Sequence, residues 1–381
     1  MIYLDNAATS LKKPQAVIDA VVDALNHAGN AGRGSSESAL AATRTIFQTR
    51  LQLSQLINNP DPHGISFTYN ATDSLNTVIR GLFQAGDHVI TTVMEHNSVL
   101  RPLYDLMDQG LEVTFLDRGP QGHIEASAVQ AAIRPNTKAM VLTHASNVTG
   151  DINPIKSIAQ VLHQAGCLCI VDASQTMGAI PIDVQDLGID VLCFTGHKSL
   201  LGPQGTGGIY RQSQVAIRPL KSGGTGVDTF NHHQPDEYPT HLEAGTLNSH
   251  GLAGLKAGVD YLLDYGVDRI QKEERALLDY FHQAVQTIPG IRIYGHFDSQ
   301  IARCPILSLN IADLDSALVS EELIDRAEIM TRAGGHCAPL MHQVLKTKEQ
   351  GVVRFSLSHY TSREDLDQAV QCLKDIQAEF C

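Results

Sequence analysis

The sequence predicts an α/β fold: a large domain with a mainly parallel sheet, followed by a smaller α+β domain. Apolar runs that are each followed by a polar turn and a helical pattern recur along most of the 381-residue chain. Such runs are typical of parallel strands that are buried on both faces. After about residue 255 the pattern changes. At this length two domains are expected, and we place them at residues 15–255 and 256–381, the second completed by residues 1–14.

The large domain is predicted to open with a helix in KPQAVIDAVVDALNHAG, between Pro14 and Gly29. Its apolar residues fall on one helical face: Ala16, Val17, Ala20, Val21, Ala24 and Leu25. Four strand–turn–helix units follow, in GISFTYNATDSLNTVIRGL, DHVITTVMEHNSVLRPLYDLM, AMVLTHASNVTGDINPIKSIAQVLHQAG and CLCIVDASQTMGAIPID. The stretch DVLCFTGHKSLLGPQGTGGIYR predicts two short strands around a glycine-rich turn.

The small domain is predicted from a different sequence pattern, in which strand–helix units no longer repeat. One long helical pattern covers GLKAGVDYLLDYGVDRIQKEERALLDYFHQAVQTI. Short strands are predicted in ILSLNI and GVVRFSLS, and a closing helix in SREDLDQAVQCLKDIQAEF. A mixture of this kind, without repeated strand–helix units, is typical of an α+β domain.

Composition narrows the class of protein. Hydrophobic residues make up 43% and charged residues 18% of the chain, as in an ordinary globular protein. The N-terminus shows no secretory signal, and no apolar run approaches the roughly 20 residues that span a bilayer. The net charge of −13 disfavours nucleic acid or an anionic membrane as the main partner.

The seven cysteines predict a reduced, cytoplasmic setting, because their number is odd and none forms a CxxC pair. Cys167, Cys169 and Cys193 lie in apolar runs, where they are expected to be buried hydrophobic residues. Cys337 differs, because it lies in RAGGHCAPL, after a histidine and two glycines. A nucleophile needs a mobile backbone and a nearby group that handles protons, and a buried structural cysteine needs neither.

Polar residues follow the predicted strands where a ligand site is expected. In open parallel sheets, ligands bind beyond the carboxyl ends of the strands. The residues found there are Ala71, Thr72, His96, Asn147, Asp172, Gln175, Thr195, His197 and Lys198. Each alone has an ordinary structural interpretation, such as a solvated lysine or a helix-capping aspartate.

Together these residues have a chemical logic. A lysine in a partly dry pocket can condense with an aldehyde as a Schiff base. Pyridoxal 5′-phosphate (PLP) needs such a lysine, an acidic partner for its pyridine nitrogen and a cradle for its phosphate. Lys198, Asp172 and the helix N-terminus that bears Thr72 would supply these three features.

The motifs resemble a known family. VDASQ, followed about 26 residues later by TGHKSLLGPQGTGGIY, resembles the PLP signature of the class V aminotransferase superfamily of fold type I. The segments YLDNAAT, EHNS, SNVTG, HLEAGTLN, RAGGHCAP and VRFSLSHY extend the resemblance over essentially the whole chain. Together they are similar to cysteine desulfurases and selenocysteine lyases, on the group II (SUF-type) side.

The resemblance implies a role for each cofactor-binding residue. Lys198 would bond to PLP, Asp172 would pair with its pyridine nitrogen and Gln175 with its ring hydroxyl. His96 would stack on the ring and handle protons. The phosphate would be held at the helix start, by residues Ala71, Thr72, Thr195 and His197. Thr246 of the partner subunit would reach the same phosphate, which implies a homodimer.

The resemblance also implies how the substrate is used. Asn147 and Arg354 would bind L-cysteine, with Arg354 holding its carboxylate in a bidentate fork, and Arg33 would lie near the entrance. Cys337 falls on the family's nucleophile: its thiolate would attack the substrate sulfur, release alanine and keep a persulfide for an acceptor protein.

The sequence departs from the SUF-type motifs at two places, and two alternatives to a cysteine desulfurase stay open. SUF-type enzymes carry two adjacent histidines where this chain has EHNS and GGHC, which leaves open the sulfur acceptor and the choice between cysteine and selenocysteine. A selenocysteine lyase or another class V lyase or aminotransferase is the alternative within enzymes, although a transaminase has no use for GGHCAP. A thiol redox or metal-binding module would use His336, Cys337 and His342, but their spacing matches no familiar zinc site, and we expect no metal.

Overall fold

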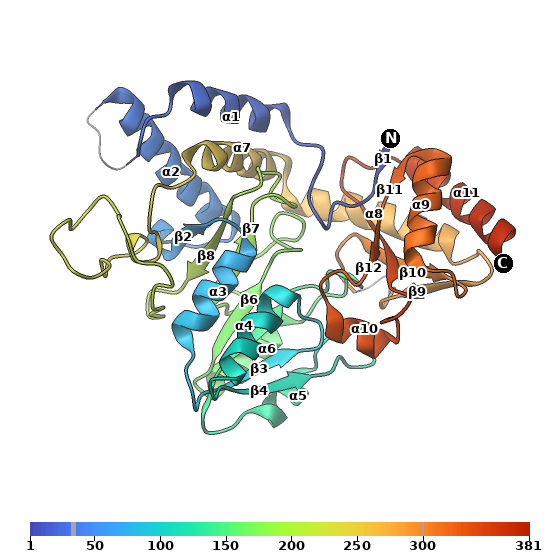
Figure 1. Cartoon of the computed structure of the whole chain (residues 1–381), viewed down its shortest axis with the longest axis horizontal. Helices are drawn as coiled ribbons and strands as arrows, with labels where there is room; N and C mark the ends of the chain where they lie inside the picture. The colour runs from blue at the N-terminus through green and yellow to red at the C-terminus, as the bar shows by residue number, and fades with distance from the viewer. Residues whose placement is uncertain (32–35, 299–300) are drawn as a thin grey trace.

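A computed structural model describes residues 1–31, 36–298 and 301–381. Its main feature is a seven-stranded sheet in the order β2-β8-β7-β6-β5-β3-β4 (Figure 1). The strands in this order are Ile65–Thr68, Gly207–Arg211, Val191–Thr195, Leu168–Asp172, Thr137–Thr143, His88–Thr92 and Glu112–Leu116. The five from β7 to β4 run parallel, whereas β8 is antiparallel to both β7 and β2. The prediction of a mainly parallel sheet is confirmed.

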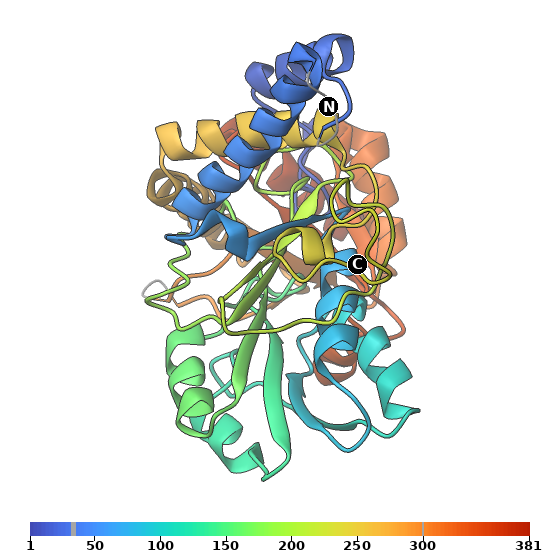
Figure 2. The ribbon, with the colours of Figure 1, turned by 90° about the vertical axis from the view of Figure 1, so that its left-hand side faces the viewer.

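Both faces of the sheet are buried, as continuous apolar runs require. Successive residues of β6 alternate between two cores: Cys169 and Val171 lie in one, and Ile170 lies in the other. Helices α3 (Ala71–Leu82) and α4 (Asn97–Met107) cover one face. Helices α2 (Glu37–Leu56), α6 (Ile155–Gln164) and α7 (Ser249–Tyr265) pack in the core of the other. Figure 2 shows α6 and the pair α3 and α4 on opposite sides of the strands.

A third core belongs to a four-stranded antiparallel sheet in the order β12-β13-β10-β9. Its strands are Arg332–Gly334, Val352–Ser356, Ile306–Ile311 and Ile291–Tyr294. Helices α8 (Val267–Val285), α9 (Ser316–Ala327) and α11 (Arg363–Phe380) contribute to this core. Strand β1 (Ile2–Tyr3) pairs in parallel with β11 (Ile329–Met330), so the N-terminal segment joins the C-terminal part of the chain.

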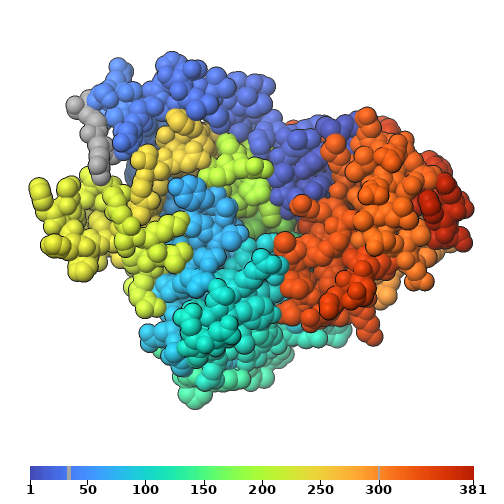
Figure 3. Space-filling view, viewed as in Figure 1, coloured from blue at the N-terminus to red at the C-terminus, as the bar shows by residue number. Residues whose placement is uncertain are grey.

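The core that contains α2, α6 and α7 meets the core of the four-stranded sheet along α8. Buried apolar residues of the α2, α6 and α7 core extend to Ile270, and those of the other core begin at Leu278. The short helix α10 (Pro339–Leu345) follows β12 in sequence but packs in the core of α2, α6 and α7 through Met341 and Leu345. Figure 3 shows the resulting contact of the orange and red C-terminal part with the cyan and teal part that contains α4. The division into two domains at residue 255 stays a prediction.

The remaining elements are short or peripheral, and they do not enter the site. They are α1 (Gln15–His27), α5 (Ala126–Ala132) and two 3₁₀ helices, η1 (Pro62–Gly64) and η2 (Thr240–Leu242). Among the helices in the described part of the chain, none is long and apolar enough to cross a membrane.

Two local predictions were wrong. No helix follows β6, because Gly178 has a φ of +94° and a Cβ there would collide with the carbonyl of Ser199, so the chain turns instead. The long helical pattern is broken into α7 and α8 at Gly266, whose φ is +92°. The helix predicted between Pro14 and Gly29 is confirmed as α1, although only Val17 and Ala24 of its apolar face are buried and Leu25 is 61% exposed.

Candidate active site

A cavity of about 280 Å³ lies where the carboxyl ends of β5, β6 and β7 meet the start of α3 and the residues that open α4. The structure brings together in its lining the nine strand-end residues predicted from the sequence, from Ala71 to Lys198. Five further residues line it that the sequence argument missed: Ala8, Asn70, Ser98, Thr143 and Ser174. The size is near the lower end of the range for small-molecule sites.

Lys198 lies in the turn after β7. Burial lowers the pKa of its amine to about 8, the nearby Asp172 carboxylate opposes this shift, and the Arg354 guanidinium adds to it. Within the described residues, the amine makes no hydrogen bond or ion pair. A substantial fraction is therefore neutral near physiological pH, which makes Lys198 a usable nucleophile.

Asp172 ends β6 and is buried. Its Oδ1 accepts hydrogen bonds from the backbone N–H of Ser174 at 2.9 Å and from the Ser174 hydroxyl at 2.5 Å. Both hydrogen bonds fall on one oxygen, so they orient the carboxylate and leave Oδ2 for another donor. Next to it, the Gln175 amide donates to the carbonyl of Ala7 at 3.2 Å.

The other end of the cavity is suited to an anion. Helix α3 begins there, with Asn70 as its N-cap, and exposes backbone N–H groups toward the helix start. The Thr195 hydroxyl is buried and has no hydrogen-bond partner among the described residues. Burial lowers the pKa of His197 to about 4, so its ring is neutral. A Cβ at Gly207 would lie 2.7 Å from Asn70 Cα, so only glycine lets β8 come this close to the start of α3.

His96 and Glu95 lie between these two ends. The His96 ring caps α4 by accepting from the Ser98 N–H, and burial lowers its pKa. Glu95 is fully buried, which raises its pKa to about 8, and its Oε1 accepts from Thr92 at 2.6 Å and from the N–H of Thr143 at 3.1 Å. Glu95 thus joins the ends of β3 and β5, a role that no local sequence pattern indicates.

The loop that carries Cys337 lies between β12 and α10. Cys337 is exposed, and both it and His336 have positive φ angles, 55° and 49°. Two hydrogen bonds hold this loop over the cavity rim: the Asn97 N–H donates to the Cys337 carbonyl at 2.7 Å, and the Asn147 amide donates to the His336 carbonyl at 2.7 Å. Burial lowers the pKa of His336 to about 3, and its ring stacks on that of His342.

Arg354 lies on β13, outside the cavity lining, and its guanidinium is buried. One terminal nitrogen donates to the Asn147 carbonyl at 3.0 Å, and the other donates to the Asp5 carboxylate at 2.9 Å. Its Nε is buried without a partner in the described part of the chain. The Nε–H and the second hydrogen of the neighbouring terminal nitrogen therefore stay available for a side-on fork.

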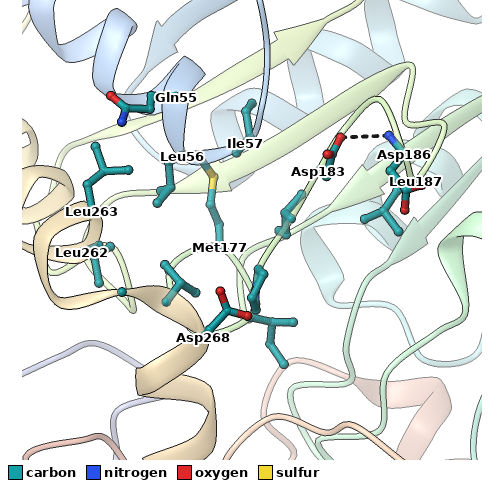
Figure 4. A pocket seen from close by; sticks show the side chains of 16 residues that line it. Gln55, Leu56, Ile57, Met177, Asp183, Asp186, Leu187, Leu262, Leu263 and Asp268 are labelled. Carbon is teal, nitrogen blue, oxygen red and sulfur yellow. Dashed lines mark hydrogen bonds between the residues drawn. The ribbon is translucent and has the colours of Figure 1, made fainter.

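Two predicted site residues remain, Thr246 and Arg33. Thr246 is exposed and does not line it in this single chain, and Arg33 lies outside the described residues. A second cavity of about 410 Å³ is bounded by the end of α2, the turns after β6 and the junction of α7 with α8 (Figure 4). Its lining contains no lysine, arginine or histidine that could hold a phosphorylated cofactor. Over the described ranges, no three histidine, cysteine or acidic side chains are placed to hold a metal ion, and this includes His336, Cys337 and His342.

Comparison with known proteins agrees with this geometry. The family model described as aminotransferase class-V matches residues 2–369. A probable cysteine desulfurase of Methanothermobacter thermautotrophicus is 34% identical over 98% of this chain and 94% of its own length. A cysteine desulfurase of Yersinia pestis is 33% identical over 99% of this chain and 93% of its own.

Solved structures are also similar to this chain. The apo structure of a cysteine desulfurase from Thermococcus onnurineus has a TM-score of 0.93 at 30% identity, covering 100% of this chain and 95% of that one. A cysteine desulfurase of Escherichia coli has a TM-score of 0.89 at 31% identity, covering 99% of this chain and 94% of that one. The chain belongs to the class V aminotransferase family, and the resemblance inferred from its motifs is confirmed.

Proposed function

We propose that this protein is a PLP-dependent cysteine desulfurase that converts L-cysteine to L-alanine and carries the sulfur as a persulfide on Cys337. One observation supports this proposal most strongly: a lysine with a lowered pKa lines a cavity whose rim holds an exposed cysteine loop. Relatives that match over nearly the full length are named cysteine desulfurases.

The residues of the cavity fit PLP. The unpaired Lys198 amine suits the aldehyde carbon, and the Asp172 carboxylate suits the pyridine nitrogen. The unpartnered Thr195 hydroxyl and the start of α3 suit the phosphate, with Thr72 and His197 beside them. Gln175 would face the ring hydroxyl and His96 the ring itself. When bound, PLP supplies an electron sink that weakens the bonds to the substrate Cα.

The protein's own residues orient the substrate. Arg354 would hold the substrate carboxylate through its free Nε–H and a neighbouring N–H, and Asn147 would contact it from the cavity wall. The Asp172 carboxylate would keep its orientation toward the ring nitrogen, because the N–H and the hydroxyl of Ser174 both donate to its Oδ1. Arg33 would be the remaining substrate contact, near the entrance.

Cys337 would do the sulfur chemistry. Its thiolate attacks the sulfur of bound cysteine, so that an S–S bond forms on Cys337 while the bond from that sulfur to the substrate Cβ breaks, and that electron pair goes to the carbon side. The proton that completes alanine would be the one that the Lys198 amine removes from the substrate Cα, and His96, which lines the cavity, would donate a hydrogen bond from Nε2 to the reacting atoms. The exposed loop then presents the persulfide to an acceptor protein of unknown identity.

The assembly and setting are part of the proposal. The exposed Thr246 would complete the phosphate site of a second copy, so the protein would act as a homodimer. A cytoplasmic location would keep the seven cysteines reduced, and all of them are unpaired.

The test is direct. The purified protein should absorb in the near-visible range. With an added dithiol that reduces the persulfide on Cys337, it should release sulfide and alanine in equal amounts from L-cysteine. Cys381 is the other exposed cysteine, so Cys381→Ser is the matched control and should keep full activity. A panel with selenocysteine and cysteine sulfinate separates the desulfurase from a selenocysteine lyase, which would release selenide and leave cysteine untouched. A colourless protein that bound no PLP would contradict the proposal.

A further inference from the structure

Ser98 lines the cavity but has no role in the chemistry proposed above. It is a buried residue in the first turn of α4, and its hydroxyl lies between two residues of the cavity. The hydroxyl is 2.9 Å from Nδ1 of His96 and 2.8 Å from the hydroxyl oxygen of Thr72. Ser98 therefore bridges the anion end of the cavity to the imidazole.

The directions of these hydrogen bonds follow from one contact. The backbone N–H of Ser98 donates to Nδ1 of His96 at 3.1 Å. A backbone N–H cannot accept a hydrogen bond, so Nδ1 must carry a lone pair and the proton of the neutral ring is on Nε2. The Ser98 hydroxyl can then only donate to Nδ1, and it accepts from Thr72. The chain of donors runs from Thr72 through Ser98 to His96.

We propose that Ser98 is a positioning residue, whose hydroxyl holds His96 as a neutral ring with its proton on Nε2 and links that ring to Thr72. The catalytic meaning of this inference rests on the proposed function, because it is the desulfurase that needs a proton at Nε2. The hydrogen-bond arrangement itself does not depend on it.

Charged groups surround His96 on several elements. Burial is the main cause that lowers its pKa, and Lys198 after β7, Arg354 on β13 and Arg101 on α4 act in the same direction. Asp172 on β6 acts against them by favouring the protonated ring. The Ser98 hydroxyl also acts to lower the pKa of His96, because a donor to Nδ1 stabilises the form in which Nδ1 has no proton.

Removing the hydroxyl has a predictable sign. Ser98→Ala keeps the backbone cap of α4 but deletes one of the two donors to Nδ1. Protonation of the ring becomes easier, so the pKa of His96 should rise by about half a unit to one unit, the equivalent of one ordinary hydrogen bond. Protonation would place a hydrogen on Nδ1 against the Ser98 N–H and displace the ring, so turnover should fall as His96 becomes protonated at low pH. In Ser98→Ala this fall should move to higher pH by the same amount.

The test uses ¹⁵N NMR of histidine rings in the chain without cofactor, with the His96 signals assigned by their loss in His96→Asn. In the wild type, Nε2 should carry the proton and Nδ1 should show a hydrogen-bonded lone pair. In Ser98→Ala, the Nδ1 signal should move toward the value of a free imine nitrogen and the titration midpoint should rise. Ser98→Thr retains the hydroxyl and should restore both.

The matched control is Ser74→Ala, which deletes a buried hydroxyl of α3 that contacts Thr68 and Gly208 and not His96. It should leave the His96 signals unchanged. Identical His96 shifts and midpoints in Ser98→Ala and the wild type would overturn the inference.

An activity measurement separates this inference from the function on which it builds. With L-cysteine, Ser98→Ala should lose about tenfold in kcat, with little change in KM. This is less than the hundredfold or more expected when an acid–base group itself is lost, because His96 remains. An unchanged kcat and pH profile would contradict the catalytic part. If the wild type released no sulfide at all, the proposed function would fail, and the NMR result would still decide whether Ser98 positions His96.

Discussion

The cavity and the Cys337 loop hold their functional side chains in different ways. In the cavity, groups from the ends of β5, β6 and β7 are buried and fixed by neighbours, as Ser174 fixes Asp172. In the loop, Cys337 is exposed, and its backbone is held by two hydrogen bonds to the rim. Chemistry at the substrate Cα needs fixed charges in a dry site, whereas sulfur delivery needs a reachable thiol. The difference indicates that the two steps can be separated by mutation.

The largest effect is expected in the cavity. Lys198→Ala should abolish the near-visible absorbance and all turnover, because no other amine lines the cavity in the described part of the chain. Lys13 is a matched control: burial also lowers its pKa to about 8, but it donates to Ser10 and to the Gly202 carbonyl. Lys13→Ala should keep the absorbance. A Lys198→Ala protein in which borohydride still fixes PLP to the chain would refute the assignment.

The next effect separates the two regions. Cys337→Ala should keep the cofactor absorbance but lose nearly all desulfuration of cysteine, because the thiol that accepts the sulfur is gone. Selenocysteine should be spared in part, since selenium is a better leaving group. The assay compares alanine formation from the two substrates, with protein concentration corrected for folded material. If the variant were less stable but fully active per folded molecule, Cys337 would be only a packing residue.

A partial effect is expected at the carboxylate. Asp172→Asn should keep some cofactor but lose about a hundredfold to a thousandfold in kcat, the usual cost of removing a preorganised electrostatic partner. Steady-state kinetics at saturating PLP measure this loss. Turnover close to that of the wild type would show that Asp172 only caps the turn after β6.

A smaller effect is expected from pH. Because the pKa of Lys198 is lowered to about 8, its amine is mostly protonated below that pH and mostly neutral above it. The rate at which the chain without cofactor takes up PLP should rise about tenfold per pH unit up to about pH 7 and level off above pH 8. Stopped-flow absorbance gives this profile. A rate that kept rising to pH 10 would mean an ordinary, solvated lysine.

Much of the cavity could be predicted from the sequence, because the carboxyl ends of parallel strands must lie at one edge of a sheet. That rule needs only the strand positions, and Asp172 and Lys198 follow from it. Glu95 was missed because its role depends on hydrogen bonds that join two strand ends, at Thr92 and Thr143. Ser98 was missed because its hydroxyl contacts Thr72 at the start of another helix, although EHNS places it two residues after His96. The pairing of Arg354 with Asp5 joins residues 349 positions apart and leaves no local signal.

The local errors in the fold have a common cause. Hydrophobic periodicity continued through Gly266 and after β6, but a positive φ at Gly266 separates α7 from α8, and a positive φ at Gly178 lies in a turn where a helix was predicted. Periodicity reports which side chains share a face and not which backbone angles a close contact imposes. The same periodicity predicted α1 correctly, although its apolar face is wider than its buried surface and Leu25 is exposed.

The division of work between the two regions is tested most directly by mass spectrometry of the wild-type protein after brief exposure to L-cysteine. The protein should gain one sulfur atom, and peptide mapping should place it on Cys337 within RAGGHCAPL. The exposed Cys381 and the five buried cysteines should gain none. An added sulfur on another cysteine, or on none while alanine is formed, would contradict the assignment of sulfur transfer to this loop.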